Sequence, residues 1–211
     1  NGIPYSPRKQ GAGLVQLQNA VKTDVFLLNS DNTKPKAEIG YNESGNFSFD
    51  FKAVSIGDDT VQYEPTITVL TEDTVSENGV VYMAQKARKL SDDEVYVTIP
   101  KKITVDPNGE TPVNVKIELT EKGKANLKAQ FPNGIYIEGF VTMTPIQNDE
   151  VSLSYPFMGF FGDWQALNIF DSDIYDDEPA SICETQIGQF RNSDGGGYIL
   201  GHNYYVDGAT E

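Results

Sequence analysis

The densest group of side chains with metal-binding chemistry is an acidic run between residues 171 and 178. Carboxylate oxygens are the ligands that Ca²⁺ prefers, so such a cluster is a candidate calcium site. Its members are Asp171, Asp173, Asp176, Asp177 and Glu178. The run departs from an EF-hand loop, because Tyr175 stands at the third ligand position and the turn glycine is missing. We therefore expect a solvated loop, with calcium as the less favoured alternative, and assign no metal ligand.

His202 and Cys183 are the only histidine and the only cysteine among the 211 residues. One cysteine excludes an intrachain disulfide, and a structural zinc site needs about four Cys or His ligands. A Ser-His-Asp or Cys-His unit would depend on His202 alone, and the sequence has no Gly-x-Ser-x-Gly nucleophile motif. Cys183 precedes Glu184, whose charge disfavours a thiolate. We expect a surface or linker histidine and an unreactive thiol, and assign no catalytic residue.

Two short motifs have a chemical and a structural interpretation. Gly195-Gly-Gly197 lacks the lysine and the strand-loop-helix context of a phosphate loop, so we expect a hinge or tight turn there. Asn42-Glu-Ser44 and Asn46-Phe-Ser48 match the N-glycosylation pattern, which matters only in a eukaryotic secretory setting. The sequence predicts no cofactor.

An aromatic series near residue 160 admits a binding interpretation and a packing interpretation. The rings are Tyr155, Phe157, Phe160, Phe161 and Trp164. Exposed and coplanar, they would form a platform for carbohydrate; turned inward, they would fill the core of a sheet protein. Packing is the favoured interpretation, because rings on a strand more often lie inside than outside.

The net charge and the hydrophobic pattern limit the kinds of partner that the chain can bind. With 16 Lys and Arg against 31 Asp and Glu, the formal charge is −15, which repels a phosphate backbone, so no nucleic acid is expected. No apolar run approaches the roughly 18 residues that span a bilayer, so no membrane insertion is expected within this segment. An apolar content of 38% is enough for a folded core.

The elements that would position these residues are mostly strands, because hydrophobic side chains alternate at period two from Thr23 onward. Phe47, Phe49 and Phe51 share one face of the clearest example, and Pro65 suggests an edge or a bulge. Residues 71–93 are polar and mixed, which predicts a long loop with a short hairpin around Asn78-Gly79. The expected strands are 23–28, 36–41, 46–56, 62–70, 95–99, 103–105, 113–119, 135–143 and 151–161.

One helix is predicted from Glu121 to Gln130, with Thr120 as its N-cap, although Gly123 weakens it by about 1 kcal/mol relative to alanine. Seven to nine strands with short turns and one minor helix indicate an all-β, antiparallel β-sandwich over residues 23–165. Residues 1–22 and 166–211 are irregular extensions, although 14–21 could form one or two helical turns. We expect the apolar Ile3, Leu14, Val15 and Leu17 to fold back on the sandwich or to mediate contacts between molecules.

Four stretches in order resemble a known protein family. Residues 4–20 resemble the end of a subtilisin-like serine protease domain, and 131–141 and 155–164 resemble late strands of the fibronectin-III-like domain that follows it. Leu200-Gly-His-Asn203 is similar to the motif before the next accessory domain. This is the arrangement of the Gram-positive cell-envelope proteinases, the group with lactocepin and the streptococcal C5a peptidases.

The resemblance implies a division into three parts. Residues 1–22 would be the C-terminal tail of the catalytic domain, 23–165 the fibronectin-III-like domain, and 166–211 a loop-rich lead into the next accessory domain. The family's catalytic Asp, His and Ser lie in motifs upstream of Asn1, and the Gly-Thr-Ser-Met-Ala nucleophile motif is absent here. No catalytic residue transfers to this chain, which starts at Asn1 and is interpreted as a piece of a longer protein.

The leading hypothesis is therefore a non-catalytic accessory domain of an extracellular, cell-wall or cell-surface subtilisin-like protease of a Gram-positive bacterium. Its partners would be the catalytic domain of the same parent chain and protein substrates. The alternative is a stand-alone adhesin or carbohydrate-binding sandwich that uses the Tyr155–Trp164 rings. An independent hydrolase built around His202 is the third hypothesis.

Overall fold

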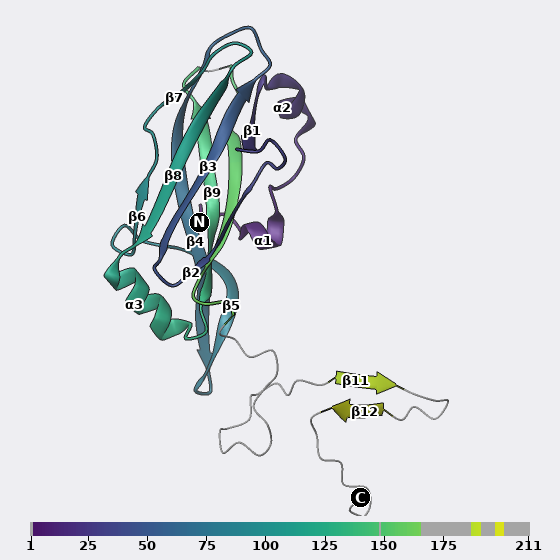
Figure 1. Cartoon of the computed structure of the whole chain (residues 1–211), viewed down its shortest axis with the longest axis vertical. Helices are drawn as coiled ribbons and strands as arrows, with labels where there is room; N and C mark the ends of the chain where they lie inside the picture. Colours follow the sequence, from purple (N-terminus) through teal and green to yellow (C-terminus); the bar gives the residue numbers. More distant parts are fainter. Residues whose placement is uncertain (1, 148, 166–186, 191–196, 201–211) are drawn as a thin grey trace, which may run out of the picture. The chain divides into compact units, whose positions relative to one another are not determined.

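A computed structural model describes residues 2–147, 149–165, 187–190 and 197–200. The chain divides into two compact units, residues 1–164 and residues 165–211. In the second unit the described residues form an antiparallel pair of short strands, β11 (Ile187–Phe190) and β12 (Gly197–Leu200). All further description concerns the first unit, which is a sandwich of two sheets (Figure 1).

The first sheet has four antiparallel strands in the order β1-β3-β8-β6. Its two long central strands lie side by side along the length of the sandwich in Figure 1, and its edge strands are short. The bounds are β1 (Val25–Asn29), β3 (Asn46–Ser55), β6 (Val95–Thr98) and β8 (Glu110–Leu119).

The second sheet runs β2-β10-β9-β4-β5, and β7 pairs with the start of β4. Its pairs are antiparallel except β2–β10, which is parallel, a feature that strand patterns alone did not predict. The bounds are β2 (Ala37–Asn42), β4 (Val61–Glu77), β5 (Val80–Lys89), β7 (Ile103–Val105), β9 (Ile135–Pro145) and β10 (Leu153–Phe161). The predicted all-β sandwich is confirmed.

The core lies between the sheets and is built from the alternating faces of their strands. Phe47, Phe49 and Phe51 of β3 are buried, as the period-two pattern predicted. Two of them stack on rings of β10: Phe51 on Tyr155 at 4.7 Å between centroids, and Phe49 on Phe157 at 5.3 Å. These offset stacks join the two sheets across the core.

The predicted loop at 71–93 is wrong. Residues up to Glu77 continue β4 and residues 80–89 form β5, so the region is a long hairpin. Its turn is the predicted Asn78-Gly79, with φ of 53° and 82°, the left-handed values that a tight hairpin turn requires. Much of this ribbon is exposed on both faces, so no face has to be apolar and the alternation that marks other strands is missing.

Pro65 occupies a local edge, as predicted. On one side β4 pairs with β9 throughout this region, while on the other side β7 covers Val61–Tyr63 and β5 begins only at Leu70. No strand pairs with Pro65 on that open side, so the missing N–H of proline costs the sheet no hydrogen bond there.

The predicted helix is α3 (Glu121–Gln130), and the Thr120 side chain accepts a hydrogen bond from the Gly123 N–H at 3.0 Å. Two shorter helices lie in the N-terminal segment, α1 (Pro7–Gln10) and α2 (Leu17–Lys22). Gly123 is required by packing, because a Cβ at this position would lie 2.1 Å from the carbonyl oxygen of Glu94.

Glu94 ties the end of the β4–β5 hairpin to α3. Its carboxylate accepts hydrogen bonds from Arg88 at 2.7 Å, from the Ser91 N–H at 3.1 Å and from Asn126 at 3.4 Å. Burial raises the pKa of Glu94, but the hydrogen bonds from Arg88 and Ser91 and the Arg88 charge lower it more, to about 2.

We predict that Gly123→Ala destabilises the domain by about 1–3 kcal/mol, because the new methyl group collides with a backbone oxygen that cannot move freely. On an exposed helix the same change would stabilise. Urea unfolding of the variant measures the effect, with Gln130→Ala on the exposed side of α3 as the control. A Gly123→Ala variant as stable as the control would contradict the close packing.

We predict a loss of stability in acid that depends on Glu94. Because its folded-state pKa lies below the ordinary 4.5, the carboxylate stabilises the fold at neutral pH, and this contribution disappears as the pH falls toward about 2. Glu94→Gln should lower the neutral-pH free energy of unfolding by at most about 3 kcal/mol and flatten its decline below about pH 5. Chemical denaturation between pH 2 and pH 7 measures this dependence, with Glu118→Gln at an exposed position as the matched variant. If Glu94→Gln and Glu118→Gln give the same pH profile, Glu94 is not the source of the loss of stability in acid.

Candidate functional site

Two carboxylates are buried on the outer face of the second sheet, the face turned away from the sandwich core. Ile137 belongs to the core, so its neighbour Glu138 on β9 points outward. Leu70 of β4 lies directly opposite Glu138, and Glu72 follows two residues later on the same face. Glu138 is 0% exposed and Glu72 is 2% exposed. Charges at this depth are stable only when they are paired.

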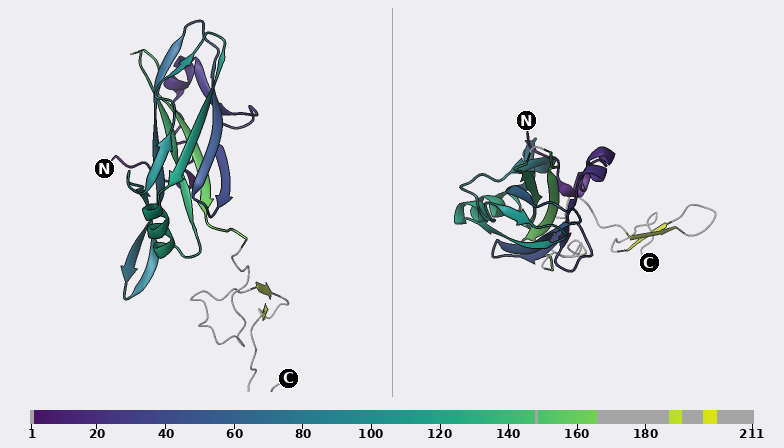
Figure 2. Two further views of the ribbon diagram at one scale, coloured as in Figure 1. Left: turned by 60° about the vertical axis from the view of Figure 1, so that its left-hand side comes forward. Right: turned by 90° about the horizontal axis from the view of Figure 1, so that it is seen from above.

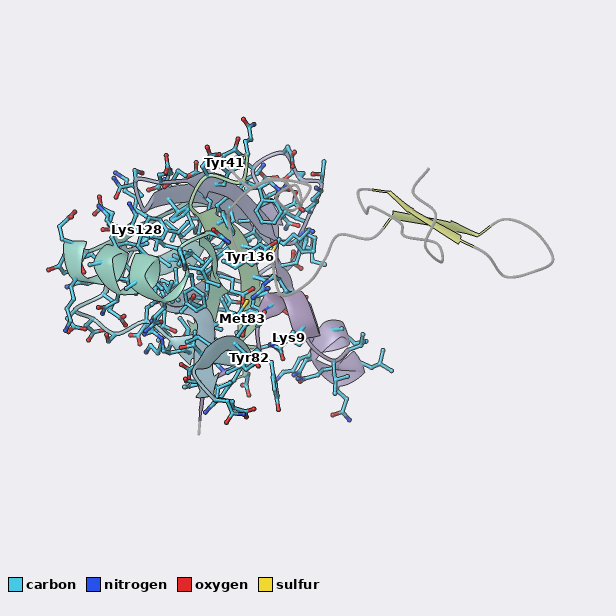
Figure 3. All side chains as sticks on the ribbon, turned by 90° about the horizontal axis from the view of Figure 1, so that it is seen from below. Lys9, Tyr41, Tyr82, Met83, Lys128 and Tyr136 are labelled. Atoms are coloured by element: carbon cyan, nitrogen blue, oxygen red, sulfur yellow. The ribbon has the colours of Figure 1, made fainter. Side chains whose placement is uncertain are left out.

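The pairing charge comes from the N-terminal segment. Arg8 donates from Nε to Glu138 Oε2 at 2.9 Å, and from Nη2 to Glu138 Oε1 and Glu72 Oε1 at 3.0 Å each. Lys9 Nζ lies 3.2 Å from Glu72 Oε1, and the guanidinium carbon lies 4.1 Å from the centre of the Tyr136 ring. We call the group Arg8, Glu72, Glu138 and Tyr136 the Arg8 clamp. Figure 3 labels two of the residues around Arg8, Lys9 and Tyr136.

The electrostatics of the clamp favour the charged guanidinium. Burial lowers the pKa of Arg8, but the hydrogen bonds and charges of Glu138 and Glu72 outweigh burial and leave that pKa raised. The fork of the guanidinium matches Glu138 in two parallel bonds, which lysine cannot reproduce. The arrangement is suited to holding two chain segments together, and it contains no group placed for catalysis among the described residues.

Local sequence places Arg8 at the right point. Buried Ser6 caps α1 by accepting from the Arg8 N–H at 3.2 Å, and Pro7 occupies the first helical position. Gly11 ends the helix with φ of 60° and donates to the Pro7 carbonyl at 2.8 Å. A groove of about 360 Å³ lies between this turn and the β2–β10 pair, with Pro7, Ala12, Pro156 and Met158 in its walls.

The aromatic series is divided between the two faces of the second sheet. Tyr155, Phe157 and Phe161 belong to the core, which confirms the packing interpretation. Phe160 is buried on the outer face, where its ring centre lies 5.4 Å from that of Tyr136 and 4.8 Å from that of Trp164. Trp164 is 49% exposed, but it stands at 88° to Phe160. The described rings therefore form no coplanar row, and the carbohydrate alternative lacks the geometry it requires.

Of the two alternatives for the apolar side chains of residues 1–22, folding back on the sandwich is wrong, whereas contacts between molecules stay a prediction. Ile3 is 46% exposed, and Leu14, Val15, Leu17 and Val21 are 94%, 82%, 74% and 87% exposed. The attachment is made by Ser6 and Arg8 instead. Nothing in the local pattern marked Arg8 as the partner of two buried carboxylates, because Glu72 and Glu138 lie far away in the chain.

The other candidate motifs are only partly within the described residues. The Asn42 side chain closes a turn, donating to the Asn46 carbonyl at 3.0 Å and accepting from the Gly45 N–H at 2.8 Å. Gly197 begins β12, whereas the acidic run 171–178, Cys183, Gly195 and His202 lie outside the described part. The described residues hold no group of three or more Asp, Glu, His or Cys suited to a metal ion. In the same part of the chain, no helix has the length and apolar character to cross a bilayer.

Two facing sheets with this strand order define a sandwich domain of the fibronectin-III-like class. The model of the family described as "Fn3-like domain" matches residues 37–158, from β2 into β10, and the chain belongs to that family.

Among curated proteins, the chain is 30% identical over 177 residues to a C5a peptidase of Streptococcus pyogenes, covering 84% of this chain and 14% of that protein. It is 29% identical over 180 residues to the PI-type proteinase of Lactococcus lactis subsp. cremoris, covering 82% and 9%. The chain thus spans a small part of these relatives. A PapD-like domain of human CEP192 matches with a TM-score of 0.40 and 15% identity, over 65% of this chain and 84% of that one.

We predict that Arg8→Met destabilises the domain by about 3–5 kcal/mol, because it leaves the buried Glu138 without a counter-charge and Glu72 with Lys9 alone. Chemical denaturation measures the loss. Lys34→Met is the matched control, since Lys34 and its partner Glu38 are both half exposed and water screens such a surface pair.

A triple variant tests the cause of that loss. Glu72→Gln and Glu138→Gln, added to Arg8→Met, should recover part of the stability, because neutral amides are less costly to bury than carboxylates. If Arg8→Met is no worse than Lys34→Met, the clamp does not hold the segment to the sheet.

Proposed function

We propose that this chain is a non-catalytic accessory domain of a longer subtilisin-like serine protease located at the surface of a Gram-positive bacterium. In this proposal residues 1–22 are the end of the catalytic domain, 23–165 are the Fn3-like domain, and 166–211 lead toward a further domain. The catalytic triad lies upstream of Asn1. The likeness to a peptidase and a proteinase over more than four-fifths of this chain supports the proposal.

The observation that carries the proposal is the Arg8 clamp. It fastens the segment that enters the domain to the outer face of the second sheet, through a guanidinium bound to Glu72 and Glu138. A flexible linker needs no buried ion pair, whereas a fixed orientation between two domains does. The clamp therefore favours an accessory domain whose task is to hold its neighbour in a constant position.

A second observation concerns what the neighbour would cover. Directly after the clamp, Leu14, Val15, Leu17 and Val21 present four large apolar side chains to solvent within eight residues. Such a patch marks a contact surface in a larger assembly. The rest of the catalytic domain is the occupant we propose, because in this proposal residues 14–21 belong to its last segment.

The role of the domain follows from its rigidity. Stacked aromatic rings and two paired sheets give a scaffold that supports a neighbouring active site without taking part in its chemistry. Loops at the ends of the sandwich would then frame the groove where protein substrates bind. The reading frame upstream of Asn1 provides the first test: an Asp, His and Ser triad in subtilisin order is expected there, and its absence overturns the proposal.

We predict that Leu17→Asp with Val21→Asp leaves the 211-residue chain unchanged within about 0.5 kcal/mol, because both side chains are already in water. In the longer parent the same pair should lower the free energy of unfolding by at least about 2 kcal/mol, since buried apolar contacts are lost. Thermal unfolding of both proteins is the measurement.

Ile146→Asp is the control, because Ile146 is an exposed apolar residue too, at 44%, but lies outside the N-terminal segment. It should leave both the parent and the 211-residue chain unaffected. A parent that tolerates Leu17→Asp with Val21→Asp as well as it tolerates Ile146→Asp would show that this surface is not covered by the preceding domain.

A further inference from the structure

Four asparagines in the chain are each followed by glycine, the dipeptide in which an asparagine side chain loses its amide group most readily. The backbone nitrogen of the glycine attacks the side-chain carbonyl carbon of the asparagine, so the reaction needs a free glycine N–H and room to move. Asparagine is for this reason among the thermolabile residues. The dipeptides are Asn1-Gly2, Asn78-Gly79, Asn108-Gly109 and Asn133-Gly134. Asn1 lies outside the described residues, so the last three can be compared.

Two of these three glycines are held by their surroundings. The Gly109 N–H donates to the Asp106 carbonyl at 3.0 Å, and the Gly134 N–H donates to the Phe131 carbonyl at 3.0 Å. Both glycines are also packed: a Cβ at Gly109 would lie 3.0 Å from the Asp106 carbonyl oxygen, and one at Gly134 would lie 2.5 Å from the Phe160 ring. Either nitrogen must give up its hydrogen bond before it can attack an asparagine.

The third dipeptide lacks these restraints. Asn78 and Gly79 form the two-residue turn between β4 and β5, and both are exposed. The flanking residues Glu77 and Val80 pair with each other, so the hydrogen bonds that close the turn do not involve the Gly79 N–H. Within the described chain, no hydrogen bond uses that N–H or the Asn78 side chain. A Cβ added at Gly79 would meet no atom within 4 Å.

The position of the turn also allows it to open locally. Figures 1 and 2 show the tips of β4 and β5 projecting past α3 and past the other strands of the sandwich. The ladder shifts register between the pairs Glu72–Ala87 and Thr74–Met83, which separates the tip from the rest of the hairpin. An exposed tip of this kind opens at a small cost in free energy, while the sandwich stays folded.

We propose that Asn78 is a site of spontaneous deamidation, at which the hairpin tip acquires an acid after synthesis. The Gly79 nitrogen loses its proton to a base in the solvent and bonds to the Asn78 side-chain carbonyl carbon, and the amide group takes up a proton and leaves as ammonia. Water then opens the resulting ring at either carbonyl carbon, which gives aspartate or isoaspartate. The net reaction consumes one water and releases one ammonia. The inference concerns this chain alone and stands whether or not the parent is a protease.

The isoaspartate product changes the hairpin as well as its charge. It directs the main chain through the former side chain, so the turn becomes longer by one methylene group. A two-residue hairpin turn fixes the register of its strands, and the longer turn no longer fits that register. Pairing of Val75 with Tyr82 in the tip should therefore weaken, whereas Leu70 and Lys89 pair beyond the register shift and should stay paired.

The first test follows the folded 211-residue chain at mildly alkaline pH by peptide mapping and mass spectrometry. Deamidation at Asn78 should be at least about fivefold faster than at Asn108 or Asn133, because the hydrogen bonds of Gly109 and Gly134 make the reactive opening rarer. In urea the three rates should converge, since the sites share one dipeptide. The proposal is overturned if Asn78 reacts no faster than the other two in the folded chain, or stays intact there while the unfolded chain reacts.

The matched variant is Asn78→Gly, which removes the amide and keeps a residue that adopts the positive φ of the turn. Incubated wild-type chain should exchange the Tyr82 amide hydrogen at least about tenfold faster than fresh chain, whereas the Leu90 amide, bonded to the Val69 carbonyl, should be unchanged. Incubated Asn78→Gly should show neither change. An equal acceleration at Tyr82 in Asn78→Gly would mean that another process alters the tip, and would also overturn the proposal.

Discussion

The structure depends on one electrostatic constraint: two carboxylates are buried on the outer face of a sheet, and two neighbouring cations of the N-terminal segment, Arg8 and Lys9, pair with them. Without Arg8, Glu138 would be a buried charge without a partner and Glu72 would keep only Lys9, a condition that costs several kcal/mol. The N-terminal segment is therefore held to the sandwich by the unfavourable energy of leaving the sheet uncovered. Buried ion pairs add little net stability compared with apolar packing, but they specify one arrangement, and here that arrangement fixes how the chain enters the domain.

This constraint separates the domain into parts with different tasks. The space between the sheets is apolar and is closed by stacked rings from β3 and β10, so it supplies stability. The outer face of the second sheet carries the clamp, which supplies orientation. Residues 14–21 and the half of strand β5 next to the turn each carry a group of exposed apolar side chains. A domain of this kind is suited to holding neighbours, and the family to which it belongs and its peptidase and proteinase relatives agree with an accessory role.

Sequence patterns predicted the elements whose signals are local. The strand 46–56 was evident because one of its faces is buried, and α3 because Thr120 caps it and Leu127 lies on its inner side. The hairpin of β4 and β5 was mistaken for a loop because much of it faces solvent on both sides, so burial imposes no alternation. Its turn was nevertheless visible, since Asn78-Gly79 favours left-handed backbone angles whatever surrounds it. The need for glycine at 123 was invisible, because it arises from the Glu94 backbone packed against the helix.

The sequence by itself determined the all-β character, most strand positions, the helix with its cap, the tight turns and the resemblance that indicated the family. Each of these depends on residues close together in the chain, where backbone preference and one-sided burial act directly. Only the tertiary structure decided the site. Arg8 is separated by 64 residues from Glu72 and by 130 from Glu138, and no local preference relates them. They meet because strand register aligns Leu70 with Glu138 and because two buried carboxylates are stable only beside a cation.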